Sequence, residues 1–345
     1  MSGTGVVLMN LGGPDSAGAV EPFLFNLFYD SAIIQLPNPF RWLIAKLIAR
    51  RRGRVARQIF AKIGNVSPLL QNTQAQAAAL ERVLGQGFRV AIAMRYWAPR
   101  ASEAAAALKA WEVERVILLP LYPQFSSTTT ASSITDWDHA ARKIGLGVPT
   151  RAICCYPAEA GFVAAVASAI DRAIAAWPAE IALPRLLLSA HGLPQRVVAR
   201  GDPYQSQVEQ TARAIHAALS SRNIEAVVCY QSRVGPLKWL MPATDAEIRR
   251  AGEDGRGVIV APIAFVSEHS ETLVELDIEY RHLAAASGVP RYVRVATVGA
   301  AESFVAGLAA LVRAACATMD AAPYPEGGRS HCEDRFGLCA RREVT

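Results

Sequence analysis

Short runs of β-branched and other apolar residues alternate along the chain with longer stretches in which apolar residues recur every three or four positions. The short runs predict strands buried on both faces of parallel sheets, and they cover residues 5–9, 88–94, 115–119, 186–189, 226–230 and 258–260. The longer stretches predict helices, among them 72–84 and 301–318. Strands that alternate with helices in this way indicate an α/β fold.

The two halves of the chain carry related patterns. Residues 116–133, VILLPLYPQFSSTTTASS, and residues 258–273, VIVAPIAFVSEHSETL, each place a β-branched strand before a proline, an aromatic residue and a serine-rich helix start. We therefore predict two Rossmann-like domains, each with a four-stranded parallel sheet, which face each other across a cleft. The expected domains are 1–180 and 181–320, with the last helix packing back on the first domain, and 321–345 is expected to be a flexible tail.

An insertion at about 21–60 interrupts the first domain and is predicted to form a lip over the cleft. Its first part is aromatic and apolar, and its second part combines apolar residues with many basic ones, including Arg51 and Arg52. A basic amphipathic helix of this kind can lie on an anionic membrane surface or bind a carboxylated apolar ligand. An ordinary packed helix with a solvated basic face explains the same pattern, so the residues alone leave both interpretations open.

Carboxylates recur in the stretch that follows the last of these strands. Ser267 is suited to cap a helix, and Glu268, Glu271, Glu275 and Glu279 follow it at three- and four-residue spacing. At about 100° per residue these four side chains would share a narrow sector of an α-helix. They form either a solvated acidic face or a path for protons or divalent cations. Their position at the carboxyl end of a buried strand, where open α/β sheets bind ligands, favours the path.

His191 directly follows a predicted strand and precedes Gly-Leu-Pro, so its ring is expected at the cleft. A single histidine is more often structural. If Glu271 reaches it from the facing half, however, a neutral imidazole and a carboxylate converge on one point. That pair suits proton abstraction or the transient binding of a borderline divalent metal.

Composition narrows the class of protein. With 345 residues, of which 52% are hydrophobic and 19% charged, the chain is expected to be folded and globular outside its tail. No run reaches the roughly 18 apolar residues that span a bilayer, and the N-terminal residues lack the basic start of a signal peptide, so we expect a cytoplasmic protein. The net charge of +6 is local and does not predict nucleic-acid binding. The six cysteines show no disulfide or zinc spacing.

Several ordered motifs match a known family. They are NLGGP at 10–14, FNLFYD at 25–30, MRYWAP at 94–99, LYPQFSSTTTASS at 121–133, SAHGLP at 189–194, GDPY at 201–204, CYQSRVGPLKWL at 229–240 and PIAFVSEHSETLVELDIEY at 262–280. On these motifs the chain, from Val6 to about Arg313, resembles the ferrochelatases, the terminal enzymes of protohaem synthesis. The resemblance implies a chelatase-like fold with two Rossmann-like domains around a porphyrin cleft. It also implies a lyase that inserts ferrous iron into protoporphyrin IX and releases two protons.

The resemblance implies roles for individual residues. His191 would bind the incoming metal or take a pyrrole proton with Glu271 facing it, and Glu268, His269 and Glu275 would form the path for protons or hydrated iron. The implied porphyrin-binding residues are Arg95, Tyr96, Phe265, Trp239, Phe60, Ser67, Arg51 and Arg52. The lip would contact the inner face of the cytoplasmic membrane. We therefore expect a peripheral membrane protein, either a monomer or a homodimer, without a nucleic-acid partner.

Some members of that family carry a 2Fe-2S cluster, which needs four thiolates. The thiols available here are Cys154, Cys155, Cys316, Cys332 and Cys339. Cys155, with Cys332 and Cys339 from the tail, is the best candidate set, and Arg341 stands where a further tail cysteine would complete it. A cluster is therefore an open alternative.

Other functions fit parts of the pattern. A coproporphyrin ferrochelatase, or a cobalt chelatase for a more carboxylated tetrapyrrole, would share the facing halves and the histidine, but the amphipathic lip favours protoporphyrin. A haem or porphyrin carrier would need the cleft and the lip but neither His191 nor the acidic residues. A module that binds a small anion through the hydroxyl-rich loop 126–133 would leave the apolar lip unexplained.

Overall fold

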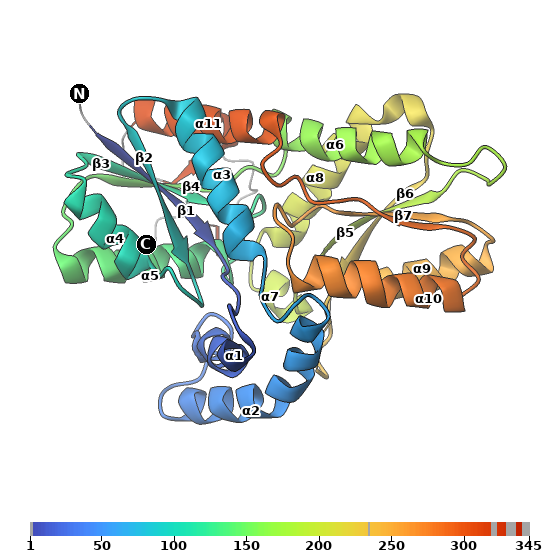
Figure 1. The fold of residues 1–345 in the computed structure, drawn as a ribbon, viewed down its shortest axis with the longest axis horizontal. Coiled ribbons are helices and arrows are strands. Elements are labelled where there is room, and N and C mark those ends of the chain that lie inside the picture. The colour runs from blue at the N-terminus through green and yellow to red at the C-terminus, as the bar shows by residue number, and fades with distance from the viewer. Residues whose placement is uncertain (1–2, 234, 319–322, 329–335, 340–345) are drawn as a thin grey trace.

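The computed structural model describes residues 3–233, 235–318, 323–328 and 336–339, and it contains two parallel sheets (Figure 1). The first sheet consists of β1 (Thr4–Asn10), β2 (Phe88–Met94), β3 (Arg115–Pro120), β4 (Thr150–Cys155) and β9 (Tyr324–Pro325). The second consists of β5 (Arg185–His191), β6 (Ala226–Gln231), β7 (Val258–Pro262) and β8 (Tyr292–Arg294). Every strand pair is parallel, as expected for strands joined by helical crossovers.

The first four strands of the first sheet follow the same order as the four strands of the second. The first runs β2-β1-β3-β4-β9 and the second β6-β5-β7-β8, so the first strand of each half lies between the second and the third. This agreement confirms the prediction of two related α/β halves. The expectation of four strands in each sheet is wrong for the first half, because the tail supplies β9 beside β4.

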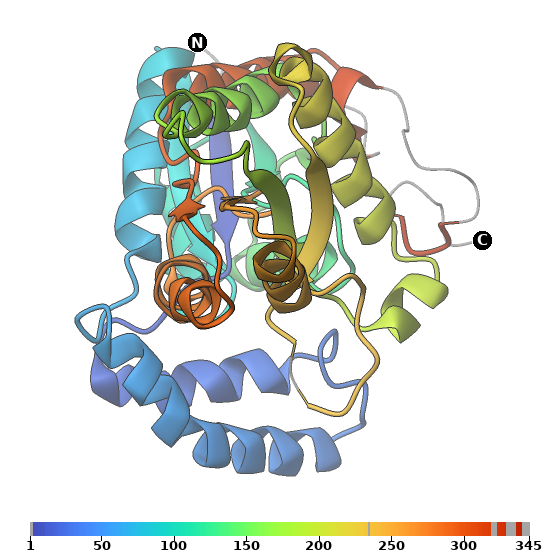
Figure 2. The ribbon, with the colours of Figure 1, turned by 90° about the vertical axis from the view of Figure 1, so that its right-hand side faces the viewer.

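Helices cover both sheets (Figures 1 and 2). The helical segments are η1 (Ala17–Ala19), α1 (Val20–Tyr29), α2 (Phe40–Ala61), α3 (Leu69–Leu84), α4 (Ala101–Ala110), α5 (Thr130–Ile144), α6 (Ala160–Ala175), α7 (Gln195–Ala199), α8 (Tyr204–Ala218), η2 (Ser220–Arg222), α9 (Thr244–Glu253), η3 (Glu271–Glu279), α10 (Tyr280–Ala286), α11 (Glu302–Ala317) and η4 (Glu326–Gly328). Within the described ranges no helix is long and apolar enough to cross a membrane.

Burial on both faces of the sheet explains why residues 6–9 of β1 are all apolar. Successive residues of a strand point to opposite faces, so Val6 and Leu8 pack on one side and Val7 and Met9 on the other. All four side chains are buried because helices cover both faces. The larger core cluster continues through α6, α8 and α11 into the second sheet, and α11 packs on α3 and α6 of the first half.

The insertion forms a lobe of its own. Helices α1 and α2 project below the two sheets and pack against each other (Figures 1 and 2). Ala45, Ala49 and Gly53 recur every four residues along α2 and are buried, whereas most of the neighbouring basic side chains are exposed. The small side chains let the two helix backbones approach, which makes this lobe a two-helix lip.

The acidic stretch after β7 differs from the α-helix that its spacing predicts. The regular element η3 starts at Glu271 and is a π-helix, in which hydrogen bonds span five residues instead of four. Glu268 and His269 precede it in irregular structure. The wider turn and the later start mean that the four carboxylates do not share one α-helical sector, and π-helical turns of this kind occur frequently at functional sites.

Candidate active site

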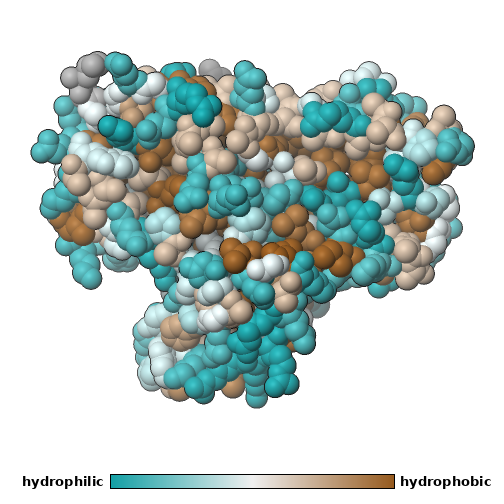
Figure 3. Space-filling view, viewed as in Figure 1, coloured by the Kyte–Doolittle hydropathy of each residue, from teal (hydrophilic) through white to brown (hydrophobic). Residues whose placement is uncertain are grey.

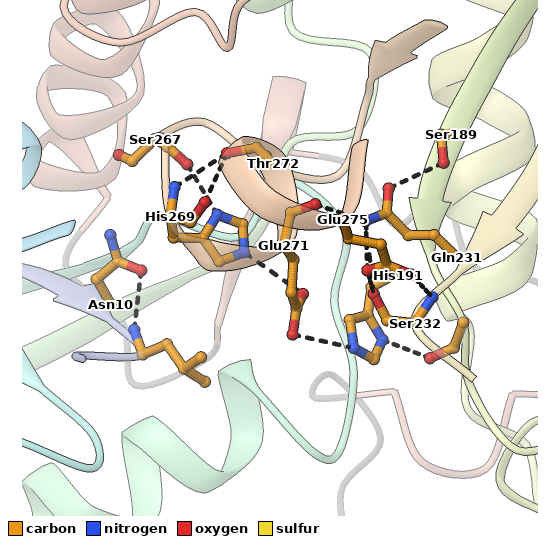
Figure 4. A network of polar contacts seen from close by, with 12 residues as sticks. Asn10, Ser189, His191, Gln231, Ser232, Ser267, His269, Glu271, Thr272 and Glu275 are labelled. Carbon is orange, nitrogen blue, oxygen red and sulfur yellow. Dashed lines mark hydrogen bonds and ion pairs between the residues drawn. The ribbon is translucent and has the colours of Figure 1, made fainter. Parts of the chain in front are cut away.

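His191 and Glu271 meet at the carboxyl end of the second sheet (Figure 4). His191 is the last residue of β5, and Glu271 follows the neighbouring strand β7. The Nε2 atom of His191 lies 3.7 Å from Oε1 of Glu271, and its Nδ1 donates to the Gly192 carbonyl at 2.5 Å. Both residues belong to the second half, so the expectation that Glu271 reaches across from the facing half is wrong. Strand adjacency brings them together instead.

The pair is charged in this structure. Burial lowers the pKa of His191, but the Glu271 carboxylate and the Gly192 carbonyl raise it more, so that the pKa lies at about 9. Burial also raises the pKa of Glu271, and the two neighbouring imidazoles, His191 first, lower it well below its ordinary value. The imidazole of His191 is therefore protonated near pH 7. This differs from the expected neutral imidazole because of the carboxylate beside it.

A second histidine holds the other oxygen of the same carboxylate. The Nε2 atom of His269 lies 3.4 Å from Oε2 of Glu271, and its Nδ1 lies 3.2 Å from the Ser267 carbonyl. The Phe265 ring lies close to both histidines, with its centroid 6.3 Å from that of His191 and 4.6 Å from that of His269. His269 and Phe265 thus both lie beside the His191–Glu271 pair, while their implied roles in the path and in porphyrin binding stay predictions.

Glu275 lies one turn further along η3, where hydrogen-bond donors surround its carboxylate (Figure 4). Oε1 accepts the Ser232 N–H at 2.8 Å and the Tyr280 hydroxyl at 2.9 Å, and Oε2 accepts the Gln231 amide at 3.2 Å and the Ser232 hydroxyl. Burial, and then the Glu271 charge, raise the pKa of Glu275. Gln231 and Ser232 were not predicted as site residues, although the CYQSRVGPLKWL motif contains both.

Glu268 is directed toward a different partner. Its Oε1 accepts from Arg294 at 2.8 Å and from the Thr297 N–H at 3.0 Å. Burial raises the pKa of Glu268, but the Arg294 guanidinium and these hydrogen bonds lower it below its ordinary value overall. Glu268 is therefore an ion-paired carboxylate next to the site, while Glu271 and Glu275 lie within it.

Arg95 and Tyr96 form a buried cluster with a carboxylate of the lip. Oδ2 of Asp30 accepts from the Arg95 guanidinium at 2.9 Å, from the Tyr96 hydroxyl at 2.7 Å and from the Ser132 hydroxyl. Tyr96 is only 1% exposed, and burial followed by the Asp30 charge raises its pKa. Both residues thus bind Asp30, which was not predicted as a site residue although it ends the FNLFYD motif.

The other predicted porphyrin residues lie at separate places. Trp239 stands beside the backbone of Gly192, so a side chain added at that glycine would meet the indole ring at 3.2 Å. Phe60 and Ser67 are buried at the foot of the lip, where Ser67 lines a cavity of about 420 Å³ together with Trp97 and Leu273. Leu273 follows Glu271 by two residues, so this cavity opens next to the acidic helix.

The basic residues of α2 face outward. Arg51 and Arg52 are exposed, and the guanidinium of Arg52 lies 6.0 Å from the centre of the Phe28 ring. Figure 3 shows a largely hydrophilic surface on this side of the lobe, with a hydrophobic strip where the lobe meets the body of the molecule. Exposed apolar side chains of the lip are Leu36, Phe40, Trp42, Leu43, Ile44, Leu47 and Val55.

The cysteines predicted as cluster ligands are only partly described. Cys154 and Cys155 end β4, both are buried, and their sulfur atoms lie 3.3 Å apart. Cys339 is half-buried, and Cys332 lies outside the described residues. Among the residues that the structure describes, no group of three or more histidine, cysteine or acidic side chains is arranged to hold a metal ion.

Two α/β halves with a histidine and a carboxylate at the carboxyl edge of one sheet have the arrangement of an α/β enzyme whose ligand binds at that edge. A profile of the ferrochelatase family matches residues 3–316. The ferrochelatase of Phenylobacterium zucineum is 50% identical over 98% of this chain and 97% of its own length, and that of Caulobacter vibrioides is 52% identical over 89% of each. The chain therefore belongs to the ferrochelatase family, lyases that insert iron into porphyrin for haem synthesis.

Solved structures support the fold. The sirohydrochlorin chelatase SirB from Bacillus subtilis subspecies spizizenii, in complex with cobalt, matches with a TM-score of 0.52 and 11% identity over 90% of this chain and 94% of that chain. SirB from Bacillus subtilis with Fe3+ matches with a TM-score of 0.50 and 14% identity over the same shares. At these identities the likeness shows the shared fold of two α/β halves.

Proposed function

We propose that this protein inserts ferrous iron into protoporphyrin IX and releases the two pyrrole protons. The observation that carries the proposal is the His191–Glu271 pair at the carboxyl edge of the second sheet, in a chain of the ferrochelatase family. The carboxylate supplies an anionic ligand for a divalent cation, and the imidazole can accept a proton once it has lost its own. A porphyrin carrier would need no such pair.

The charge state of the pair suggests how it works. Glu271 is anionic and attracts Fe²⁺, whereas His191 with a pKa of about 9 still carries a proton. A dication that approaches Glu271 repels this proton and lowers the pKa of the imidazole. His191, whose side chain is 38% exposed, releases this proton to solvent water and becomes free to bind the metal or to accept a pyrrole proton, while His269 keeps the other oxygen of Glu271 in place.

Distortion of the porphyrin ring would accelerate the insertion of iron further. The four nitrogens of a flat porphyrin lie in one plane, so iron enters quickly only when the ring is bent and its lone pairs point out of that plane. Binding between two rigid walls can use the affinity for the periphery of the ring to bend its centre. The buried sheets and the rigid cluster of Asp30, Arg95 and Tyr96 suit such walls.

An anaerobic insertion assay tests this function. Purified protein is mixed with ferrous iron and protoporphyrin IX, and the loss of free-porphyrin absorbance is followed, with coproporphyrin in parallel. We expect turnover of protoporphyrin by the wild type and none by His191→Ala, which still binds the ring. Binding without turnover in the wild type would indicate a carrier, and faster turnover of coproporphyrin would assign the other substrate.

We also propose that the lip binds the cytoplasmic face of a membrane, from which it takes its apolar substrate. Phe40 and Leu43 are 61% and 53% exposed, and the exposed Arg51 and Arg52 on the same helix can bind lipid phosphates. Co-sedimentation with vesicles that contain anionic lipid should fall for Arg51→Glu/Arg52→Glu and for Leu43→Ser. Equal binding of all variants to neutral and anionic vesicles would contradict the proposal.

A 2Fe-2S cluster remains a prediction for this chain. Pairing of Pro325 with Cys155 places the start of the tail beside one candidate ligand, and the candidate thiols Cys332 and Cys339 follow in that tail. Four thiolates are required, however, and the described residues do not assemble them. Iron and sulfide analysis of anaerobically purified protein decides the matter, since a cluster requires both elements in equal amounts.

A further inference from the structure

A buried carboxylate, Asp202, lies where the two halves meet. Its side chain is fully buried, and Oδ2 accepts from the Ser127 hydroxyl and N–H, each at 2.7 Å, and from the Ser126 hydroxyl at 3.0 Å. Oδ1 accepts the N–H of Tyr204 at 3.0 Å. Because the two serines follow β3 and Asp202 precedes α8, a single carboxylate joins the first half to the second. We call Asp202, Ser126 and Ser127 the junction.

Neighbouring contacts make the junction rigid. The Gln207 side chain accepts the N–H of Phe125 at 2.7 Å, and the Gln124 amide donates to the Thr211 hydroxyl at 2.8 Å and to the Ile263 carbonyl at 3.0 Å. Gln124, Gln207 and Thr211 are at most 2% exposed. Buried polar groups at this depth are costly to leave unpaired, so the loop after β3 has one preferred position on α8.

The junction continues to the proposed active-site histidine. The Tyr204 hydroxyl donates to the carbonyl of His191 at 3.0 Å, and Tyr204 is itself held by Asp202 through its N–H. The His191 carbonyl marks the end of β5, where the chain leaves the sheet and the imidazole faces Glu271. A shift of the first turn of α8 would therefore move His191 relative to both Glu271 and the wall of the first half.

We propose that Asp202 is a positioning residue for metal insertion, which holds the two halves at the spacing at which His191 reaches a ring bound between them. This inference rests on the proposed function. Asparagine has the size of aspartate, but its NH2 group must take the place either of Oδ2, which faces the donors of Ser126 and Ser127, or of Oδ1, which faces the Tyr204 N–H. In both orientations a donor faces a donor, and the charge that strengthens these bonds is lost. Misplacing a reacting group by about 1 Å can cost about 100-fold in rate.

The test compares Asp202→Asn with a matched loss of charge. Glu247→Gln is the control, because Glu247 is 8% exposed in the same half but is bonded to Arg250 of its own helix. In the anaerobic iron and protoporphyrin assay we expect kcat of Asp202→Asn to fall about tenfold or more, with little change in KM, while Glu247→Gln keeps both. A rise in KM alone would overturn the inference, since it would indicate a binding role.

The serine side of the junction gives an independent pair of variants. Ser127→Thr keeps the hydroxyl that donates to Asp202 and should retain kcat, whereas Ser127→Ala removes it and should lower kcat in the same direction as Asp202→Asn. If Asp202→Asn does not fold, this pair decides the outcome. Equal kcat values for Ser127→Ala and the wild type would then overturn the inference.

Two further measurements distinguish a positioning role of Asp202 from a role in stability alone. They also keep this inference separate from the proposed function. Amide hydrogen exchange in the peptide that contains Ser127 should accelerate in Asp202→Asn and stay unchanged in Glu247→Gln, whatever the protein catalyses. Out-of-plane resonance Raman bands of bound protoporphyrin should weaken in Asp202→Asn. If the wild type fails to insert iron, the proposed function fails; if it inserts iron and folded Asp202→Asn does so equally fast, only this inference fails.

Discussion

One carboxylate shared by two imidazoles is the central feature at the scale of residues. Glu271 lies 3.7 Å from His191 and 3.4 Å from His269. Both members of the pair could be predicted, because each follows an apolar strand inside a motif. Their charge state could not, because it depends on an interatomic distance that arises only when β5 and β7 lie side by side.

This pair should make stability depend on pH. The pKa of His191 in the folded protein is raised from 6.5 to about 9. Its contribution to the free energy of unfolding is therefore complete below pH 6.5 and is lost as the pH rises through about 9. The lowered pKa of Glu271 adds stability above pH 4.5 that is lost only in strong acid. Glu271→Gln removes both effects. The difference in unfolding free energy between wild type and variant should therefore be largest between pH 4.5 and 6.5 and shrink toward pH 9.

Urea unfolding at a series of pH values measures this difference. Glu279→Gln serves as the control, because the partner of Glu279 is Lys62 and not a histidine. The control should show no comparable change between pH 6.5 and 9. A constant difference between wild type and Glu271→Gln over that interval would show that the two side chains are not coupled.

At the scale of elements, the acidic stretch shows how far a periodic pattern can mislead. Spacing of three and four residues predicted an α-helix from Ser267, but the chain forms a π-helix from Glu271. The difference follows from tertiary contacts. Gln231 and Ser232 bind Glu275, while Glu268 pairs with Arg294 before the helix begins.

The two-helix lip yields a prediction about packing. Ala49 of α2 is 1% exposed in a helix that packs on α1, so Ala49→Leu would overfill this contact and cost about 1–3 kcal/mol. The helices should separate more often, and amide exchange in α1 and α2 should accelerate. Val55→Ala, at a residue that is 57% exposed, is the control and should leave exchange unchanged. Unchanged exchange in Ala49→Leu would mean that the lip is not held by this contact.

At the scale of the whole molecule, two similar halves are joined by more than the chain between them. Helix α11, late in the sequence, packs on α3 and α6 of the first half, and the junction around Asp202 joins the halves again beside the site. Buried contacts therefore fix how the two halves sit relative to each other. A fixed arrangement of this kind suits the proposed reaction, which depends on bending a flat ring.

A glycine in the α6–α11 contact tests this joining of the halves. A Cβ atom at Gly161 would lie 2.1 Å from the Ser303 carbonyl oxygen, a backbone atom that cannot move without shifting α11. We expect Gly161→Ala to lower the free energy of unfolding in urea by about 1–3 kcal/mol. Gly147→Ala, where nothing lies within 4 Å, should stay within about 0.5 kcal/mol of the wild type. Equal stabilities for the two variants would show that the contact adapts freely.

The sequence by itself determined the α/β class, most strand positions, the lip helix and the two residues of the central pair. These depend on local hydrophobic patterns and on motifs, which are properties of consecutive residues. The tertiary structure alone decided that His191 and Glu271 come from neighbouring strands of one sheet, that η3 is a π-helix, and that Asp30 and Asp202 are buried between segments distant in the chain. Strand order and burial bring such residues together, and neither is encoded in the spacing along the chain.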